Sequence, residues 1–152
     1  VANTDDRKKG VLYMLQALEL LRGDGVRLTI VDDAERHSSY IEDVGPLPSY
    51  GFKLVRKLNL DGLVQFTGRL TREELAKRYS TAQMAVVPSL YEGFGIPAAE
   101  AMACGVPVVA TTGGALPEVV GDAGILVPPR NAGALAAATS EFSQLGRRRW
   151  WN

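Results

Sequence analysis

Apolar positions along the chain follow two spacings that alternate from one segment to the next. Apolar residues three and four apart predict a helix over residues 11–21, which Gly23 and Gly25 end. Short continuous apolar runs predict strands at 27–31, 64–67, 84–87, 106–110 and 125–127. Helices are expected between or after them at 52–58, 97–103, 116–119 and 132–145. Val1 and Ala2 are expected to end a strand that precedes the first helix.

A capping motif marks the start of one further helix. Thr71 and Glu74 frame the sequence Thr-Arg-Glu-Glu, in which the hydroxyl and the carboxylate each satisfy a free backbone N–H at a helix start. Leu75, Ala76 and Tyr79 are expected to supply the buried face of this helix. The motif therefore predicts a helix that begins just after residue 71 and follows the second strand.

The order of the segments indicates the fold class. Strands alternate with helices, and the strands are continuous apolar runs, which indicates that both faces of the sheet are covered. This pattern predicts an open parallel sheet with helices on both sides, a doubly wound, Rossmann-like α/β fold. Residues 32–50 are polar and rich in turn residues, so we expect a long loop there. All 152 residues are expected to form a single domain.

The composition narrows the class of protein. Apolar residues make up 46% and charged residues 22%, the usual mix of a soluble globular protein. Lysine plus arginine equal aspartate plus glutamate, at 17 each, so the net charge offers no general attraction for nucleic acid. The only cysteine, Cys104, excludes an internal disulfide and suits a reducing compartment, so we expect a cytoplasmic protein. With His37 as the only histidine, no metal site built from a histidine cluster is expected.

The chemistry is concentrated in residues 88–100, which run from a predicted strand through a glycine-bearing loop into a helix. In doubly wound sheets, ligands bind beyond the carboxyl ends of the strands, where this loop is expected. Gly93 and Gly95 allow the backbone to approach a ligand closely. The N–H groups of Phe94, Gly95 and Ile96 are expected at the N-terminus of the helix, whose partial positive charge suits a phosphate.

Two carboxylates flank this predicted phosphate-binding loop. Glu100 is expected in the first turn of the helix, and its side chain tilts back toward the ligand. A carboxylate accepts two hydrogen bonds side by side, which suits the vicinal diol of a ribose. Glu92, in the loop, can meet the hydroxyls of another sugar ring. Two carboxylates beside a diphosphate are expected if they bind the hydroxyls of sugars that lie at both of its ends.

The spacing of Glu92 and Glu100, with seven residues between them, resembles the E-x7-E motif of the retaining glycosyltransferases of family 4, the group 1 transferases. The likeness runs from about residue 7 to about residue 138 and covers the segments 7–10, 88–109, 113–119 and 124–129. It implies that the chain is the C-terminal, donor-binding half of a GT-B fold. The N-terminal acceptor domain of such an enzyme is absent from this sequence.

The resemblance also implies a role for each matching residue. Glu92 would bind the donor sugar and Lys9 would neutralise the donor phosphates, so these two are the candidate catalytic residues. Glu100 would bind the ribose. The remaining donor-binding residues act through their backbone: the loop amides hold the diphosphate, Leu70 faces the base, and two glycines border the sugar pocket. They are Phe94, Gly95, Ile96, Leu70, Gly113 and Gly114.

The function implied is transfer of a hexose-type sugar, with retention, from an NDP-sugar to an acceptor. The donor would be a UDP-, GDP- or ADP-sugar, and the acceptor a carbohydrate, a lipid or a small molecule. No metal and no other cofactor are expected, and nucleic acid is not an expected partner. The fragment by itself is expected to be inactive in transfer. The full protein is expected in the cytoplasm, and peripheral association with the inner face of the membrane is compatible with this.

Two departures from the family pattern keep other functions open. Asn3 stands where the family has an arginine, and Asp32 stands where it has a glycine after the second strand. An acid near the diphosphate would repel it unless the side chain points away. A non-catalytic nucleotide-sugar-binding module is therefore one alternative, and a GT-B fold UDP-sugar epimerase is another.

Two further alternatives rest on single features of the sequence. Residues 93–98 fit the dinucleotide fingerprint G-x-G-x-x-A, but that site needs an acid at the end of the next strand, where Thr111 and Thr112 stand. The basic and aromatic end, 147–151, offers charge and stacking for a membrane surface or a nucleic acid. A packed or frayed chain end is the simpler interpretation of that tail.

Overall fold

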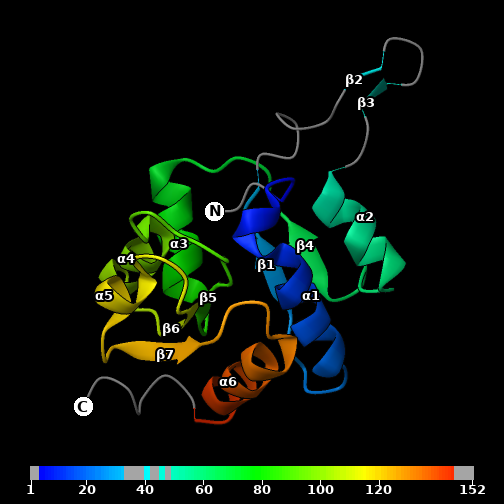
Figure 1. The fold of residues 1–152 in the computed structure, drawn as a ribbon. Coiled ribbons are helices and arrows are strands. Elements are labelled where there is room, and N and C mark those ends of the chain that lie inside the picture. Colours follow the sequence, from blue (N-terminus) through cyan, green and yellow to red (C-terminus); the bar gives the residue numbers. More distant parts are fainter. Residues whose placement is uncertain (1–3, 33–39, 42–44, 47–48, 146–152) are drawn as a thin grey trace.

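The computed structural model describes residues 4–32, 40–41, 45–46 and 49–145 (Figure 1). The expectations for Val1, Ala2, Asn3, His37 and the tail 147–151 lie outside the described residues. Among the described helices, none is long and apolar enough to cross a membrane.

The helices and strands follow one another in the predicted alternation. A short 3-10 helix, η1 (Arg7–Lys9), leads into α1 (Val11–Leu20). The other helices are α2 (Tyr50–Lys57), α3 (Arg72–Thr81), α4 (Ile96–Ala103), α5 (Leu116–Val120) and α6 (Ala132–Leu145). The strands are β1 (Leu28–Ile30), β2 (Tyr40–Ile41), β3 (Gly45–Pro46), β4 (Val64–Phe66), β5 (Ala85–Val87), β6 (Val108–Thr111) and β7 (Gly124–Val127).

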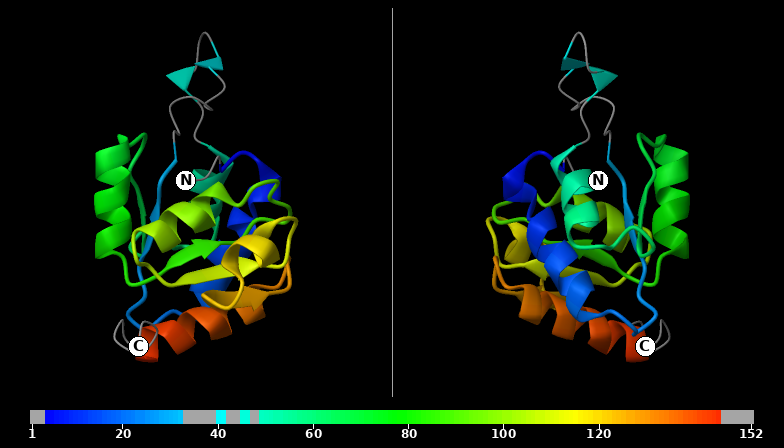
Figure 2. Two further views of the ribbon diagram at one scale, coloured as in Figure 1. Left: turned by 90° about the vertical axis from the view of Figure 1, so that its left-hand side faces the viewer. Right: turned by 90° about the vertical axis from the view of Figure 1, so that its right-hand side faces the viewer.

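The predicted α/β class with parallel strands is confirmed, but the strands do not form one continuous sheet. β1 pairs in parallel with β4, and β6 pairs in parallel with both β5 and β7. Within the described residues, no ladder joins β1 to β5, so the parallel strands form a two-stranded and a three-stranded sheet. Both sheets are visible in Figures 1 and 2, with the β1–β4 pair set apart from the other three strands.

The helices cover the sheets in layers. α4 and α5 pack on one face of the three-stranded sheet, around the buried side chains of Ala98, Val108 and Leu116. α1 and α6 pack together on the other face, with Leu135 and Val109 in their contact. The opposite side of α1 joins α2 and the β1–β4 pair. α1 is therefore the element that holds the two sheets together (Figure 1).

Residues 32–50, expected to form a long loop, contain a short antiparallel pair. Tyr40–Ile41 pairs with Gly45–Pro46 as β2 and β3, and this pair lies apart from both parallel sheets (Figure 1). The turn-rich composition predicts this local reversal of the chain only in general terms, because so short a pairing leaves no hydrophobic period to detect.

The predicted capping box of α3 is confirmed. The Glu74 N–H donates to the Thr71 hydroxyl at 3.2 Å, and the Thr71 N–H donates to the Glu74 carboxylate at 2.8 Å. The expected buried face is wrong in part, because Ala76 is exposed and Leu75 and Tyr79 are only half-buried. α3 contains no fully buried residue, since its inner side faces a groove between the two sheets.

Candidate functional site

The candidate site is built where three loops meet beyond the carboxyl ends of the strands. The loop after β5 is bonded through its backbone on both sides. The Leu90 N–H donates to the Lys8 carbonyl at 2.7 Å, and the Ala115 N–H donates to the Glu92 carbonyl at 2.8 Å. The η1 turn, residues 88–95 and the loop after β6 are thereby held in fixed register, as expected for a binding site positioned by a rigid scaffold.

Glycines permit this close approach of the loops. Gly10 has a φ of 69°, and a Cβ at this position would lie 1.8 Å from the Pro88 carbonyl oxygen. Gly114 has a φ of 66°, and a Cβ there would lie 2.3 Å from the Glu92 carbonyl oxygen. A Cβ at Gly113 would lie 2.5 Å from the Leu90 carbonyl oxygen. A larger residue at Gly10 or Gly114 would face both backbone strain and a collision with the main chain.

The two candidate catalytic residues form an ion pair. The Lys9 ammonium lies 2.9 Å from the Glu92 carboxylate, and the Ser89 hydroxyl donates to the same carboxylate oxygen at 3.1 Å. The Lys9 side chain is 28% exposed and that of Glu92 13%, so the pair is reachable but partly shielded from solvent. The site thus presents one cation and one carboxylate whose charges balance each other.

Sequence reasoning missed two hydroxyls that support this loop. Ser89 is buried and donates to Glu92, while the buried Thr111 donates from its hydroxyl to the Ser89 carbonyl. The Thr111 hydroxyl also accepts from the Gly113 N–H at 3.3 Å, so it links the loops after β5 and β6. Their place in the sequence could have indicated this role, because each residue lies at or just after the carboxyl end of a strand, where functional side chains gather.

The N-terminus of α4 is open, as predicted for a phosphate-binding helix. Gly95 precedes the helix with a φ of 68° and offers no side chain to cap it. The first-turn N–H groups therefore have no side-chain acceptor and suit an anion. Phe94 and Ile96 stand beside this terminus with 82% and 58% of their surface exposed. The helix begins at Ile96, so Pro97 is its second residue and not its first.

Glu100 is the fifth residue of α4, so the expectation that it lies in the first turn is wrong. The positive φ of Gly95 lets the helix begin one residue before Pro97, and this moves Glu100 into the second turn. Its carboxylate is half-buried and lies near Tyr79 of α3. Burial of the phenol raises the pKa of Tyr79 to about 12, and the charge of Glu100 adds to the increase. The protonated Tyr79 hydroxyl donates to the Pro97 carbonyl at 3.3 Å.

Leu70 and Asp32 take no part in the hydrogen bonds that join these loops. Leu70 is half-buried in the turn between β4 and α3, and no hydrogen bond described for the chain connects it to Lys9 or Glu92. Asp32 is 1% exposed and accepts from both the backbone N–H and the hydroxyl of Thr4. Both bonds go to Oδ2, while Oδ1 is buried without a hydrogen-bond partner among the described residues, so the carboxylate is not displayed on the surface.

The comparisons with known proteins agree on one family. Residues 1–144 match the family of glycosyl transferases group 1. The chain is 40% identical over 141 residues to the MMP alpha-(1->4)-mannosyltransferase of Mycolicibacterium hassiacum, covering 90% of this chain and 32% of the relative. It is 44% identical over 134 residues to the O-antigen chain mannosyltransferase B of Escherichia coli, covering 88% of this chain and 33% of the relative. The chain thus spans about a third of the length of these relatives.

Solved structures share the fold over nearly the whole chain. The sucrose-phosphate synthase of Thermosynechococcus elongatus superposes with a TM-score of 0.80 and 36% identity, over 95% of this chain and 35% of the synthase. The Anabaena protein HepE, solved in complex with UDP, superposes with a TM-score of 0.72 and 23% identity, over 95% of this chain and 38% of HepE. The Rossmann-like fold and the predicted resemblance are confirmed, and the chain belongs to the glycosyl transferases group 1 family of glycosyltransferases.

Proposed function

We propose that this chain binds the NDP-sugar donor of a retaining glycosyltransferase whose acceptor is bound by an N-terminal domain. The observation that carries the proposal is the Lys9–Glu92 ion pair beside the uncapped N-terminus of α4. A cation and free N–H groups suit a diphosphate, and a carboxylate suits sugar hydroxyls. The UDP complex of HepE, which shares the fold, supports a nucleotide as the ligand.

In this proposal the ion pair opens when the donor binds. The ammonium of Lys9 turns to the diphosphate, which carries more charge than one carboxylate. Glu92 then accepts hydrogen bonds from the hydroxyls of the donor sugar. The backbone amides of Phe94, Gly95 and Ile96 hold the phosphate and sugar oxygens at the positive end of α4.

The other predicted residues contact the nucleoside and the edge of the sugar. Glu100 accepts from the ribose hydroxyls, and the backbone near Leu70 faces the base. Gly113 and Gly114 border the sugar, because their lack of side chains keeps the backbone of this loop close to Glu92. Leu70 follows β4, while the two glycines follow β6, so the donor would span both sheets.

The transfer step breaks the bond between the sugar C1 and the diphosphate oxygen and forms a bond from C1 to an acceptor oxygen on the same face. Lys9 and the helix terminus stabilise the negative charge that develops on the departing diphosphate. The proton of the acceptor hydroxyl passes to the departing diphosphate oxygen, so that the step balances. These groups supply the stabilisation for which other enzymes use a metal ion. The acceptor site lies in the N-terminal domain, so this chain by itself transfers no sugar. We place the full protein in the cytoplasm, in line with the single cysteine of these 152 residues.

Calorimetric titration with UDP, GDP, ADP and their sugar conjugates tests the proposal. One diphosphate should bind, and Glu100→Ala should weaken it by about 1.5–3 kcal/mol, the cost of losing a charge-assisted hydrogen bond. Glu118→Ala, which removes an exposed acid from α5, is the matched control and should leave the affinity unchanged. Equal affinities for the two variants, or no binding of any diphosphate, would refute the assigned donor site. Binding without transfer by the longer protein would instead favour a non-catalytic module.

A further inference from the structure

Ser89 is the buried partner of the Glu92 carboxylate. It is 2% exposed, and its hydroxyl donates to Oε2 of Glu92 at 3.1 Å. The Lys9 ammonium donates to the same oxygen at 2.9 Å. The hydrogen bonds of the described residues include none to Oε1 of Glu92, so this second oxygen is the one left for the hydroxyls of a ligand.

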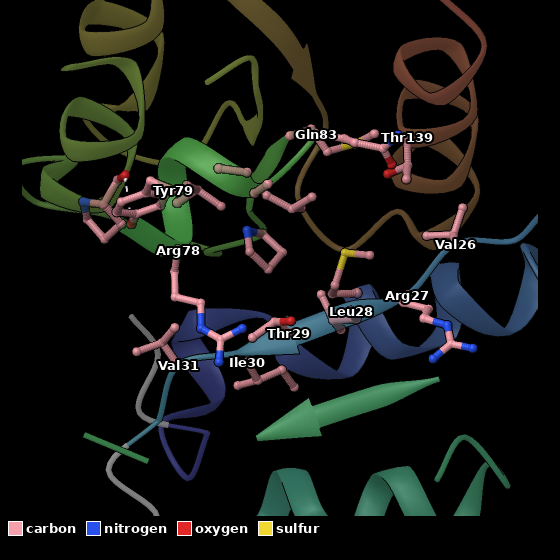
Figure 3. A pocket seen from close by; sticks show the side chains of 18 of the residues that line it. Val26, Arg27, Leu28, Thr29, Ile30, Val31, Arg78, Tyr79, Gln83 and Thr139 are labelled. Atoms are coloured by element: carbon pink, nitrogen blue, oxygen red, sulfur yellow. Dashed lines mark hydrogen bonds between the residues drawn. The ribbon is translucent and has the colours of Figure 1, made fainter. Parts of the chain in front are cut away.

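These three side chains meet at one end of the groove between the two sheets. The groove has a volume of about 720 Å³, and Lys9, Ser89 and Glu92 all line it. Figure 3 looks into this groove, with Thr29 of β1 on one side and Tyr79 of α3 on the other. The two contacts to Glu92 come from different segments of the chain, because Lys9 ends η1 and Ser89 belongs to the loop after β5.

The Ser89 contact is anchored to a fully enclosed strand. The Ser89 carbonyl accepts from the hydroxyl of Thr111, the last residue of β6, and all four residues of that strand are buried. The Thr111 hydroxyl also accepts from the Gly113 N–H at 3.3 Å. The main chain of Glu92 is held by the same loop, since its carbonyl accepts from the Ala115 N–H at 2.8 Å. Ser89 and the backbone of Glu92 are therefore fixed relative to each other.

The Lys9 contact can break without any change in this framework. The Lys9 side chain is 28% exposed, and its long flexible stem lets the ammonium turn toward an anion while η1 stays in place. Once the ammonium has turned away, Ser89 is the side-chain donor that still holds Glu92 among the described residues. Without that donor, the carboxylate would regain rotamer freedom and lose its fixed direction.

We propose that Ser89 is a positioning residue, which keeps the Glu92 carboxylate directed at the donor sugar while Lys9 neutralises the diphosphate. The inference rests on the proposed donor site and assigns separate tasks to the two contacts on one oxygen. The hydroxyl of Ser89 has a single proton, which it gives to Glu92, so Ser89 acts through that carboxylate and not on the ligand. Its removal should therefore weaken the contribution of the sugar to binding more than that of the diphosphate.

The first measurement needs no donor. Lys9→Met removes the ammonium and so imitates the state in which Lys9 has turned away. NMR relaxation of the ¹³C-labelled Glu92 side chain is recorded in Lys9→Met and in the double variant Lys9→Met/Ser89→Ala. We expect the side chain to stay ordered in the single variant and to become mobile on the picosecond to nanosecond timescale in the double variant. Equal order in the two variants would overturn the inference.

The second measurement separates the sugar from the diphosphate. UDP, UDP-glucose, GDP and GDP-mannose are titrated into the parent chain and into Ser89→Ala. We expect Ser89→Ala to weaken binding of the sugar conjugate about fivefold more than binding of its diphosphate, as loss of one hydrogen bond implies. Ser89→Thr, which keeps a hydroxyl, should restore the ratio of the two affinities. Thr139→Val, which removes a buried hydroxyl of α6, is the matched control and should leave the ratio unchanged.

The outcomes distinguish this inference from the donor site on which it rests. Equal weakening of diphosphate and sugar conjugate in Ser89→Ala would assign Ser89 a structural role only and would overturn the inference. If no diphosphate bound to the parent chain, the donor site itself would be refuted. The order of the Glu92 side chain would in that case still decide whether Ser89 holds the carboxylate.

Discussion

The three-stranded half of the molecule and the two-stranded half differ in how completely their strands are enclosed. All four residues of β6 are buried, because this strand has neighbours on both edges and helices on both faces. In β1 and β4, only Ile30 is fully buried. The loops that carry Glu92 and Gly114 follow strands of the enclosed half, while Lys9 reaches them from the N-terminal segment. The side of the candidate site that carries Glu92 and Gly114 is therefore rigid. The position of the other side, which carries Lys9, depends on its contacts with the loop after β5.

The largest expected effect comes from the contact that joins these two sides. Gly10→Ala should destabilise the protein by about 3 kcal/mol or more, because the added Cβ meets the Pro88 carbonyl in a backbone conformation that is already strained. Gly105→Ala is the matched control, since Gly105 has the same φ of 69° but no atom within 4 Å of the added Cβ. Urea unfolding of both variants measures the difference. If the two variants lost equal stability, the close approach of Gly10 to Pro88 would make no contribution of its own to the free energy of unfolding.

The second prediction compares how much stability is lost when a valine is shortened in each of the two halves. Val109→Ala in β6 removes fully buried methyl groups and should cost roughly 1.5–3 kcal/mol. Val64→Ala in β4 removes the same groups from a half-buried position and should cost less than about 1.5 kcal/mol. The free energy of unfolding of each variant decides the matter. A larger loss for Val64→Ala would reverse the contrast between the halves.

A third prediction separates function from stability at the junction. Lys9→Gln should weaken binding of the preferred nucleoside diphosphate about tenfold, since a charge-assisted hydrogen bond is lost. Its effect on the free energy of unfolding should stay below about 1 kcal/mol, because the ion pair is partly solvated. Lys77→Gln, at an exposed position of α3, is the control. Titration and urea unfolding are done on the same samples, and unchanged affinity in Lys9→Gln would remove Lys9 from the donor site.

The smallest effect concerns the capping box of α3, the helix beside the groove. Hydrogen bonds from the backbone N–H and then the hydroxyl of Thr71 hold the pKa of Glu74 below its ordinary value of 4.5. A lowered pKa in the folded state means that the stabilisation is present above pH 4.5 and is lost as the pH falls through the folded-state pKa. Glu74→Gln should therefore be less stable than the parent at pH 7, and the gap should close in acid. A gap that did not narrow at all as the pH fell below 4.5 would contradict this role of the carboxylate.

Local signals predicted the elements well. The capping motif located the start of α3, the continuous apolar run located β6, and the bounds of α6 agree with the predicted 132–145. Each signal depends on residues that are close in the sequence, so its physics is visible in a short window. The loop chemistry proposed for residues 88–100 also rests on residues that are close in the sequence.

Long-range features could not be predicted in the same way. The ion pair joins Lys9 to Glu92, which are 83 positions apart in the sequence. Hydrophobic spacing and short motifs report only on neighbouring residues, so they cannot predict such a contact. The separation of β1 from β5 and the exposure of Ala76 depend on what lies between the sheets, which the periodicity of each segment does not record. The place of Glu100 was missed by one residue, because the left-handed conformation of Gly95 sets the helix start.

The bonds that hold the three loops together also bear on how such a site can change. The contacts Leu90–Lys8 and Ala115–Glu92 run from one backbone to another and make no demand on the side chains at those positions. Mutation can therefore exchange the side chains that meet a ligand while the loop framework is inherited intact. Directed evolution of ligand preference would do best to vary these side chains and to leave Gly10, Gly113 and Gly114 untouched.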